Sequence, residues 1–299
     1  MPALPIEVVC PSCHSVLIVD AKELICPRCQ KSYGVGSWGG YDLVPPGTLD
    51  RDGALEKSGR DREAASYESQ QRKQKTPFFL KLERTLVLRS LRELPAGAIL
   101  EVGCGTGQTT IALQRLHRAV VASDFSPQSL EILAEKGIPD VTLIGADASA
   151  LPFPDCSFAA IVAVGVVGHM PAPARERALR EFHRCLVPSG VLVLTAFNAA
   201  RFRAEGTAAS GHFGSGIPYH SWDANGLRAL AHAGGFETPM LRPYGVFLLL
   251  QHLRVRGSWS IYRLGSPVLN AIEGWVHPLL PPNLSFPSVY WIMSARKTA

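Results

Sequence analysis

Short, continuous runs of apolar residues recur at intervals from residue 96 to the end of the chain. They occupy residues 98–102, 120–123, 141–144, 158–165 and 191–196. Such runs are typical of strands that are buried on both faces of a parallel sheet. The stretches between them place apolar residues at helical spacing, as residues 109–116 and 175–185 do. Strands that alternate with helices in this way predict an α/β fold with a mostly parallel sheet.

The carboxyl-terminal part of the chain departs from this alternation. Strands are expected near residues 237–244 and 289–293, which brings the sheet to seven strands. Between them lies an apolar insertion, residues 246–286, that contains Trp259, Trp275 and several leucines. Two interpretations of it stay open. It is additional core or the face of a homodimer, or it is a lid over an apolar ligand that also contacts a membrane surface.

Polar segments precede and interrupt the sheet. Residues 46–75 mix acidic and basic side chains, which predicts a solvated linker or helix face. Residues 78–94 repeat apolar side chains at helical spacing and should pack on the sheet. Residues 198–218 predict a loop or small insertion, and Ser221 is expected as the N-cap of a helix over residues 223–233.

Composition and charge narrow the class of protein. Of 299 residues, 46% are hydrophobic and 18% are charged, so the chain can bury a core. The formal net charge of +5 is mild, and no basic stripe with interleaved aromatic residues indicates a nucleic-acid surface. No purely apolar run, that of Val246–Leu250 included, approaches the length of a bilayer span, and residues 1–5 lack the basic start of a secretory signal. We therefore expect a cytoplasmic protein, soluble or at most peripheral to a membrane.

Four of the seven cysteines form two Cys-x-x-Cys pairs, Cys10 with Cys13 and Cys26 with Cys29, separated by 12 residues. Two such turns joined by a short hairpin can close a tetrahedral zinc site, and four thiolates leave no open position for catalysis. The spacing therefore favours structural zinc, for which the neighbouring His14 is not needed as a ligand. Two disulfides, or one redox-active pair beside a structural one, are the alternatives.

The first predicted strand runs directly into a glycine loop, Gly103-Cys104-Gly105-Thr106-Gly107, which a helix follows. Strand, glycine loop and helix are the parts of a nucleotide-binding turn, in which side chains would block close approach of the backbone. The spacing is G-x-G-x-G, whereas dinucleotide-binding loops have G-x-G-x-x-G. This difference argues against NAD, the main rival cofactor.

Two aspartates end the next strands. Asp124 lies 21 residues after Gly103, where an acid can accept hydrogen bonds from both ribose hydroxyls. Asp147 follows the third strand, where its carboxylate can accept a hydrogen bond from an adenine amino group. Each residue alone has an ordinary structural explanation, but the three features together, in this order, favour an adenosine cofactor.

The series resembles the class I S-adenosylmethionine-dependent methyltransferases, with a type 11-like methyltransferase domain, over roughly residues 96–297. The segments that carry the resemblance are residues 99–107, 124–126, Asp147 with 151–153, and 186–190. The resemblance implies a Rossmann-like sheet of seven strands and a site for the cofactor S-adenosylmethionine. The cofactor-binding residues that it implies are Glu101, Gly103, Cys104, Gly105, Gly107, Asp124, Phe125, Asp147, Ala148 and Val164.

The chain divides into three parts on this interpretation. Residues 1–46 form a zinc-ribbon knuckle, which resembles the one that precedes some methyltransferase domains, among them those of certain bacterial rRNA guanine methyltransferases. Residues 47–95 form a linker and leading helices, in which Tyr67 and Phe78 either cover the cofactor or pack in the core or at the surface. Residues 96–299 form the methyltransferase domain and include the apolar insertion.

Three histidines are candidates for a general base. His169 lies beyond the carboxyl end of the 158–165 strand, where the ligands of doubly wound sheets bind. Histidine titrates near neutral pH, but we favour a packing role for His169 over a base. His212 and His220 are further candidates for a base or for contacts with the methyl acceptor.

The sequence thus predicts methyl transfer to a small, fairly apolar metabolite or lipid in a biosynthetic reaction. Two alternatives stay open. The zinc knuckle is compatible with an rRNA base methyltransferase, and the chain can also be a non-catalytic protein that binds S-adenosylmethionine or acts as a zinc-ribbon adapter. Because this scaffold serves many acceptors, the fold alone does not choose among them.

Overall fold

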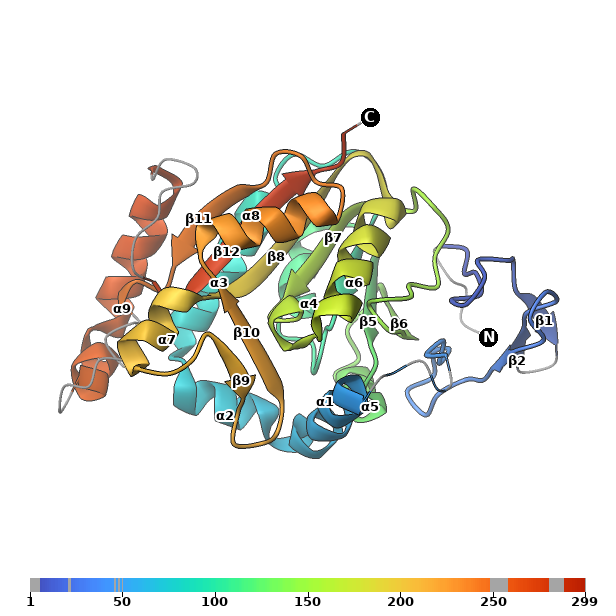
Figure 1. Cartoon of the computed structure of the whole chain (residues 1–299), viewed down its shortest axis with the longest axis horizontal. Coiled ribbons are helices and arrows are strands. Elements are labelled where there is room, and N and C mark those ends of the chain that lie inside the picture. Colours follow the sequence, from blue (N-terminus) through green and yellow to red (C-terminus); the bar gives the residue numbers. More distant parts are fainter. Residues whose placement is uncertain are drawn as a thin grey trace.

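A computed structural model describes most of the chain (Figure 1), namely residues 6–20, 23–45, 47, 49, 51–247, 258–279 and 288–298. Seven strands of the described residues form the continuous path of the central sheet, as predicted, in the order β11-β12-β8-β7-β4-β5-β6. Their bounds are β4 Ala98–Val102, β5 Val120–Asp124, β6 Val141–Gly145, β7 Phe158–Val164, β8 Leu186–Asn198, β11 Met240–Tyr244 and β12 Tyr290–Arg296. The neighbouring strands from β6 to β8 are parallel, and β12 is antiparallel to both β8 and β11.

Side chains of the central strands alternate between two apolar layers. On β4, Leu100 and Val102 join one core and Ile99 joins the other. The first core packs against α6 (Ala172–Cys185) and α8 (Ala224–Ala233), and the second against α3 (Pro77–Ser90) and α9 (Ser258–Val276). Burial on both faces explains why these strands read as continuous apolar runs.

Of the two alternatives for the segment after β8, a loop or a small insertion, the structure has the second. Residues 199–212 contain the short helix α7 (Ala199–Glu205), which Asn198 caps, and strand β9 (Ser210–His212). Strand β10 (Pro218–Trp222) then pairs antiparallel with β9 and parallel with the end of β8.

The predicted N-cap at Ser221 is wrong. The Ser221 hydroxyl donates a hydrogen bond to the Ala209 carbonyl oxygen, because Ser221 lies within β10. The carboxylate of Asp223 instead accepts a hydrogen bond from the Gly226 N–H at 2.8 Å and caps α8. Asp223 lies two positions after Ser221, and serine and aspartate are both good N-caps, which accounts for the error.

Helices fill most of the polar stretch that precedes the sheet. These are α1 (Arg51–Glu63), a 3₁₀ turn at Ala64–Ser66, α2 (Tyr67–Gln74) and α3, at whose start the Thr76 hydroxyl accepts a hydrogen bond from the Phe79 N–H. The helix after the glycine loop is short, with α4 (Thr110–Leu113) passing into a 3₁₀ turn, while α5 (Pro127–Glu135) follows β5. Glu56 on α1 is only 8% exposed, so α1 is not a fully solvated helix.

The amino-terminal knuckle contains β1 (Ile18–Asp20), β2 (Glu23–Ile25) and β3 (Ser32–Tyr33). Part of its predicted turn, Ala21 and Lys22, lies outside the described residues. The knuckle lies at one end of the molecule, next to β6 (Figure 1). There Gly145, the last residue of β6, accepts a hydrogen bond from the Leu43 N–H at 2.7 Å and donates one to the Tyr41 carbonyl at 2.8 Å.

The apolar insertion is described in part. Residues 258–276 form α9 and residues 277–279 a 3₁₀ turn, whereas residues 248–257 and 280–287 lie outside the described residues. Helix α9 lies at the end of the molecule opposite the knuckle (Figure 1). Among the described helices, none has both the length and the apolar character needed to cross a bilayer.

Candidate functional site

The loop between β4 and α4 is shaped by its glycines. Gly103, Gly105 and Gly107 have φ angles of +66°, +52° and +88°, a region that other residues rarely adopt. A Cβ atom on Gly103 would lie 2.4 Å from the Val166 side chain, and one on Gly107 would lie 2.3 Å from the Leu133 side chain. The loop therefore requires glycine for its conformation and for the space around it.

The Asp124 carboxylate holds this loop in place. One of its oxygens accepts a hydrogen bond from the Gly105 N–H at 2.8 Å, and the other accepts one from the Ser126 N–H at 2.9 Å. The side chain is 7% exposed, and burial raises its pKa. A carboxylate can accept about four hydrogen bonds, so Asp124 can still accept one from a ligand hydroxyl in addition to those from the backbone.

Asp147 has a similar position at the end of the neighbouring strand. Its carboxylate accepts a hydrogen bond from the Ser149 N–H at 2.8 Å and is 7% exposed. Asp124 and Asp147 both line one cavity at the carboxyl ends of the parallel strands, as the topology of the sheet requires. Seven of the predicted cofactor-binding residues line it: Gly103, Gly105, Asp124, Phe125, Asp147, Ala148 and Val164.

The other three predicted residues, Glu101, Cys104 and Gly107, are not part of this lining. Glu101 is 2% exposed, and its carboxylate accepts a hydrogen bond from the Thr110 hydroxyl at 2.6 Å. Burial raises the pKa of Glu101 to about 8. Cys104 is also buried, which raises the pKa of its thiol.

Helix α1 contributes residues that the sequence analysis missed. Glu56 and Arg60 line the cavity, and their side chains lie 3.7 Å apart as an i,i+4 ion pair. Burial raises the pKa of Glu56 to about 8, and Arg60 partly opposes this shift. A signal was present in the glycines of this helix, since Gly59 is buried and a Cβ on it would meet Ile217 at 2.9 Å. Glycine within a helix often marks such a close approach.

Of the two aromatic residues proposed to cover the cofactor, Tyr67 lines the cavity, whereas Phe78 is 47% exposed. Helix α2 is tied to the glycine loop, because the Thr106 hydroxyl donates a hydrogen bond to Glu68 at 3.0 Å. Helices α1 and α2 and the β9–β10 hairpin all lie at the same end of the sheet (Figure 1).

An aromatic cluster lies beside this cavity, where β8 ends. The ring of Phe197 is 5.4 Å from that of His169 and 5.7 Å from that of Tyr290, measured between centroids. Further rings extend the cluster: Phe79, Phe202, Phe213, Tyr219 and Tyr244. Lys75 lies over the Tyr290 ring at 4.7 Å, and Arg201 lies over the Phe197 ring at 5.5 Å. Both cations are ion-paired, Lys75 with Glu83 at 3.4 Å and Arg201 with Glu205 at 3.1 Å, and the rings of the cluster are not among the residues that line the cavity.

Of the three histidines predicted as candidate bases, His169 is the one whose ring packs against Phe197 and Phe213 of the aromatic cluster. Its Nδ1 is 2.9 Å from the Pro218 carbonyl oxygen, which can only accept, so Nδ1 carries the proton. Burial, together with the charge of Arg60, lowers the pKa of His169 to about 3. A ring with so low a pKa is a weak base, and this geometry supports packing.

The other two histidines are not brought together with His169. His212 lies exposed on β9. His220 lies on β10 with its ring 4.6 Å from that of Trp222, and burial lowers its pKa.

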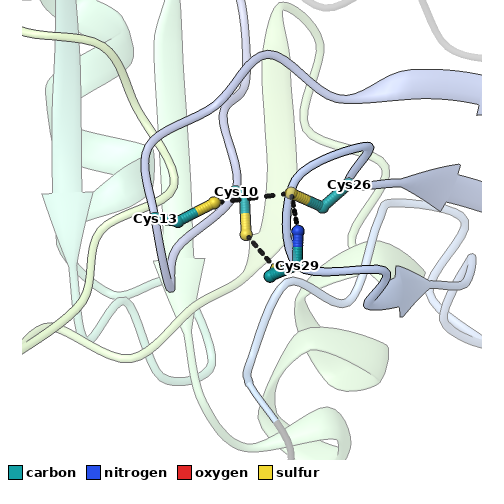
Figure 2. A group of neighbouring side chains, drawn as sticks. All are labelled: Cys10, Cys13, Cys26 and Cys29. Atoms are coloured by element: carbon teal, nitrogen blue, oxygen red, sulfur yellow. Dashed lines mark hydrogen bonds between the residues drawn. The ribbon is translucent and has the colours of Figure 1, made fainter.

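The four knuckle cysteines converge on one point from two similar turns (Figure 2). Their sulfur atoms all lie within 4.8 Å of one another, with Cys10 and Cys29 3.5 Å apart and Cys13 and Cys26 3.4 Å apart. All four are free thiols in the structure, and their convergence on one point favours a shared metal ion over the alternative of two disulfides. A tetrahedron with zinc–sulfur bonds of 2.3 Å has edges of about 3.8 Å, so this donor set fits zinc.

Comparisons with known proteins agree with this geometry. Residues 99–190 match the family model of a methyltransferase domain. Demethylmenaquinone methyltransferase of Renibacterium salmoninarum is 34% identical over 119 residues, which are 40% of this chain and 49% of that protein. Probable tRNA methyltransferase 9B of Homo sapiens is 32% identical over 143 residues, which are 45% of this chain and 30% of that protein.

The fold has counterparts among solved structures. One is 1,6-didemethyltoxoflavin-N1-methyltransferase of Burkholderia thailandensis, solved with 1,6-didemethyltoxoflavin and S-adenosylhomocysteine. It superposes with a TM-score of 0.56 at 17% identity and covers 93% of this chain and 100% of that one. The chain therefore carries a methyltransferase domain in the Rossmann-like fold of S-adenosylmethionine-dependent methyltransferases. It spans half or less of the length of these two curated relatives.

Proposed function

We propose that this protein transfers a methyl group from S-adenosylmethionine to a small, planar, fairly apolar acceptor. The observation that carries the proposal is the cavity between the glycine loop, Asp124 and Asp147, with the aromatic cluster beside it. Asp124, Asp147 and Glu63 line the cavity together with Arg60 and Arg177, so its charged groups leave a small negative excess that suits a cationic ligand.

The fit to this cofactor rests on the chain's own groups. At Gly105 the glycine loop leaves room for close approach of a ligand to the backbone, since the nearest atom to a Cβ there would be in Tyr67 at 4.0 Å. Asp124 accepts from ribose hydroxyls, and Asp147 with Ala148 lies where the adenine edge is expected. Glu101 lies behind the loop and holds its shape through Thr110. When bound, S-adenosylmethionine supplies a methyl group already activated by its sulfonium, so the protein mainly positions the acceptor.

The aromatic cluster supports an aromatic or quinone-like acceptor. The half-buried rings of Phe197 and Tyr290 offer flat surfaces on which such a molecule can stack, whereas Phe202 is buried and already stacked on Tyr219. Lys75 and Arg201 lie over these rings, but each is already paired with a carboxylate, Glu83 and Glu205 respectively, so the net positive charge that they offer an acceptor is small. His169, held by Pro218, shapes this surface. The acceptor named for the Renibacterium relative agrees with this class.

Calorimetric titration with S-adenosylmethionine, with NAD as control, tests the cofactor assignment. Binding of S-adenosylmethionine alone is expected. A radiolabelled methyl group should then pass to compounds in an apolar extract and to isolated aromatic hydroxyl compounds. Binding of neither cofactor would contradict the proposal and favour an adapter.

A nucleobase is the second candidate acceptor. The similarity to a probable tRNA methyltransferase favours it, as do stacking rings next to cations, which can also hold a base. Methyl transfer to total tRNA or rRNA, steeply weakened by salt, would support it over a small molecule.

We further propose that the knuckle cysteines hold one structural zinc ion. The thiols of Cys10, Cys13, Cys26 and Cys29 supply a full tetrahedral set, which leaves the metal no open position for chemistry. Metal analysis of protein purified under reducing conditions should find about one zinc per chain, and its absence would remove this assignment.

A further inference from the structure

Helix α9 has its polar and apolar faces inverted. Along α9 and the 3₁₀ turn after it, Leu269 packs against the second core, but the most buried side chains are mostly polar: Tyr262, Ser266, Asn270, Glu273 and His277, all at most 6% exposed. The side chains that face outward are apolar: Leu264, Val268, Ile272, Trp275 and Leu279, between 46% and 87% exposed. A helix at a water-exposed surface normally has the reverse arrangement.

The inward polar face is held by specific hydrogen bonds. The Asn270 side chain donates to the Tyr262 hydroxyl at 3.1 Å and to the Ser266 carbonyl at 2.8 Å. The Glu273 carboxylate accepts from the N–H groups of Gly245 and Val246. Such contacts fix the rotation of α9 about its axis. The five outward side chains therefore form one continuous apolar stripe, spaced at intervals of four, four, three and four residues.

A basic pocket adjoins the carboxyl end of this stripe. It lies between α3, β11, β12 and the end of α9, and four arginines line it: Arg89, Arg92, Arg242 and Arg296. Trp275 belongs to both the stripe and the pocket, and His277 lines the pocket from the buried side. No aspartate or glutamate of the described chain is part of the lining.

Two polar atoms in this pocket lack partners within the described residues. These are His277 Nε2 and Arg242 Nε, both buried. His277 is 4% exposed, and a buried group of this kind is normally hydrogen-bonded. Burial, together with the charges of Arg242 and Arg89, lowers the pKa of His277 to about 4. The pocket thus concentrates positive charge around unmet hydrogen-bonding groups.

Nearby groups neutralise only part of this charge. Arg296 donates to the carbonyls of Ser189 and Glu93, and its guanidinium lies 3.9 Å from the exposed Glu93 carboxylate. Arg89 donates to the Gly274 carbonyl, which anchors α9 on α3. These contacts leave Arg92 and Arg242 without an ion pair to a described residue. An anion with several acceptor oxygens is the complementary ligand.

We propose that α9 and the basic pocket bind the surface of an anionic phospholipid membrane, with the apolar stripe in the acyl boundary and a lipid phosphate in the pocket. Charge complementarity selects this occupant. A second copy of the chain, joined by a two-fold axis along the stripe, would bring two arginine pockets to one interface, where they repel. A nucleic acid would leave the aliphatic stripe exposed to water. The inference stands independently of the proposed methyl transfer.

Vesicle binding by the full-length protein tests the proposal. Vesicles of phosphatidylcholine with phosphatidylglycerol in equal parts should bind the protein, and pure phosphatidylcholine should bind it far less. Arg92→Gln with Arg242→Gln should weaken binding about fivefold per removed charge. Leu264→Ser with Trp275→Ser should weaken it on the order of tenfold or more. The controls are Arg228→Gln on α8 and Val19→Ser, a 56% exposed side chain of the knuckle, and neither should change binding.

Each other outcome overturns the proposal. Equal binding to both vesicle types, or binding that neither pair of substitutions weakens, removes the site. Arginine-dependent binding of inorganic phosphate without vesicle binding indicates a soluble anion instead. A dimer in light scattering that Leu264→Ser with Trp275→Ser dissociates, without vesicle binding, assigns the stripe to a second copy. Arginine-dependent binding of tRNA in place of vesicles assigns the pocket to nucleic acid.

Because all the substituted side chains are exposed or half-buried, unchanged thermal unfolding is expected and should be checked for each variant.

Discussion

At the scale of single residues, Asp124 joins the glycine loop to the cofactor cavity. Its two oxygens fix the backbone at Gly105 and Ser126, and its remaining lone pairs face the cavity. Asp124→Ala should raise the dissociation constant for S-adenosylmethionine on the order of 100-fold, because hydrogen bonds to a charged group are lost and the loop loosens. Calorimetry measures this. Asp155→Ala, which removes an exposed carboxylate paired with Arg184, is the control, and equal affinity of both variants would contradict the assignment.

Glu101 makes the stability of the protein depend on pH. Its pKa is about 8 in the folded protein and about 4.3 in an unfolded chain. Between these values the folded state binds a proton that the unfolded state has lost, so stability should fall as pH rises through this window. The slope reaches at most about 1.4 kcal/mol per pH unit for one group. Glu101→Gln mimics the protonated carboxyl and should flatten the slope.

Urea denaturation of ligand-free protein at pH 6, 7 and 8 checks this prediction. Glu56 also has a pKa of about 8, so the Glu101→Gln variant should keep part of the slope. Parallel declines in the wild type and the variant would show that Glu101 is already ionised at pH 6.

His169 is expected to shape the acceptor surface and not to remove a proton. Asn can place its amide N–H where the imidazole Nδ1–H donates to Pro218, but it provides no base. His169→Asn should therefore keep kcat within about tenfold, whereas loss of a general base costs about 10²–10⁴-fold. The measurement is kcat with the acceptor found by methyl transfer. A loss in the larger range, with a changed pH profile, would make His169 a base.

At the scale of elements, the sequence predicted best those parts whose pattern is local. Strand β7 is buried on both faces, so its apolar run was sufficient, and the glycine loop has its own spacing. Strand β10 was mistaken for the start of a helix. A strand of five residues gives only a short pattern, and both Ser221 and Asp223 are residue types that favour the N-cap position. The burial of Glu56 was missed, since it arises where α1 packs over a cavity whose other walls, with Asp124 and Asp147, are distant in the chain.

Helix α1 should act as a cover over the cofactor cavity. Gly59 lets it approach Ile217, close to the β9–β10 hairpin, and a Cβ there would lie 2.9 Å from the Ile217 side chain. Gly59→Val should displace the helix and weaken S-adenosylmethionine binding about tenfold, although valine has a higher helix propensity than glycine. Ala54→Val at an exposed position of α1 is the matched control. Equal calorimetric affinities of the two variants would mean that α1 does not cover the ligand.

At the scale of the whole molecule, the knuckle and the sheet share one apolar core. Leu17, Leu24 and Tyr33 of the knuckle belong to the same cluster as Leu100 and Phe158 of the sheet. In addition, Tyr41 and Leu43 pair with Gly145, two residues before Asp147 of the cofactor cavity. A knuckle that folds separately would have neither connection. We therefore expect the knuckle to stabilise the cofactor domain.

Loss of the metal site should consequently lower the stability of the sheet domain as well as that of the knuckle. Cys26→Ser removes one thiolate and should abolish zinc binding, lower the thermal midpoint of the single unfolding transition and weaken S-adenosylmethionine binding. Cys156→Ser, at an exposed cysteine outside the cluster, controls for loss of a thiol. Calorimetric scanning and titration measure both effects, and zinc should restore neither in Cys26→Ser. Two separate transitions in the wild type, with cofactor affinity unchanged in Cys26→Ser, would instead show an independent knuckle that is only tethered to the enzyme domain.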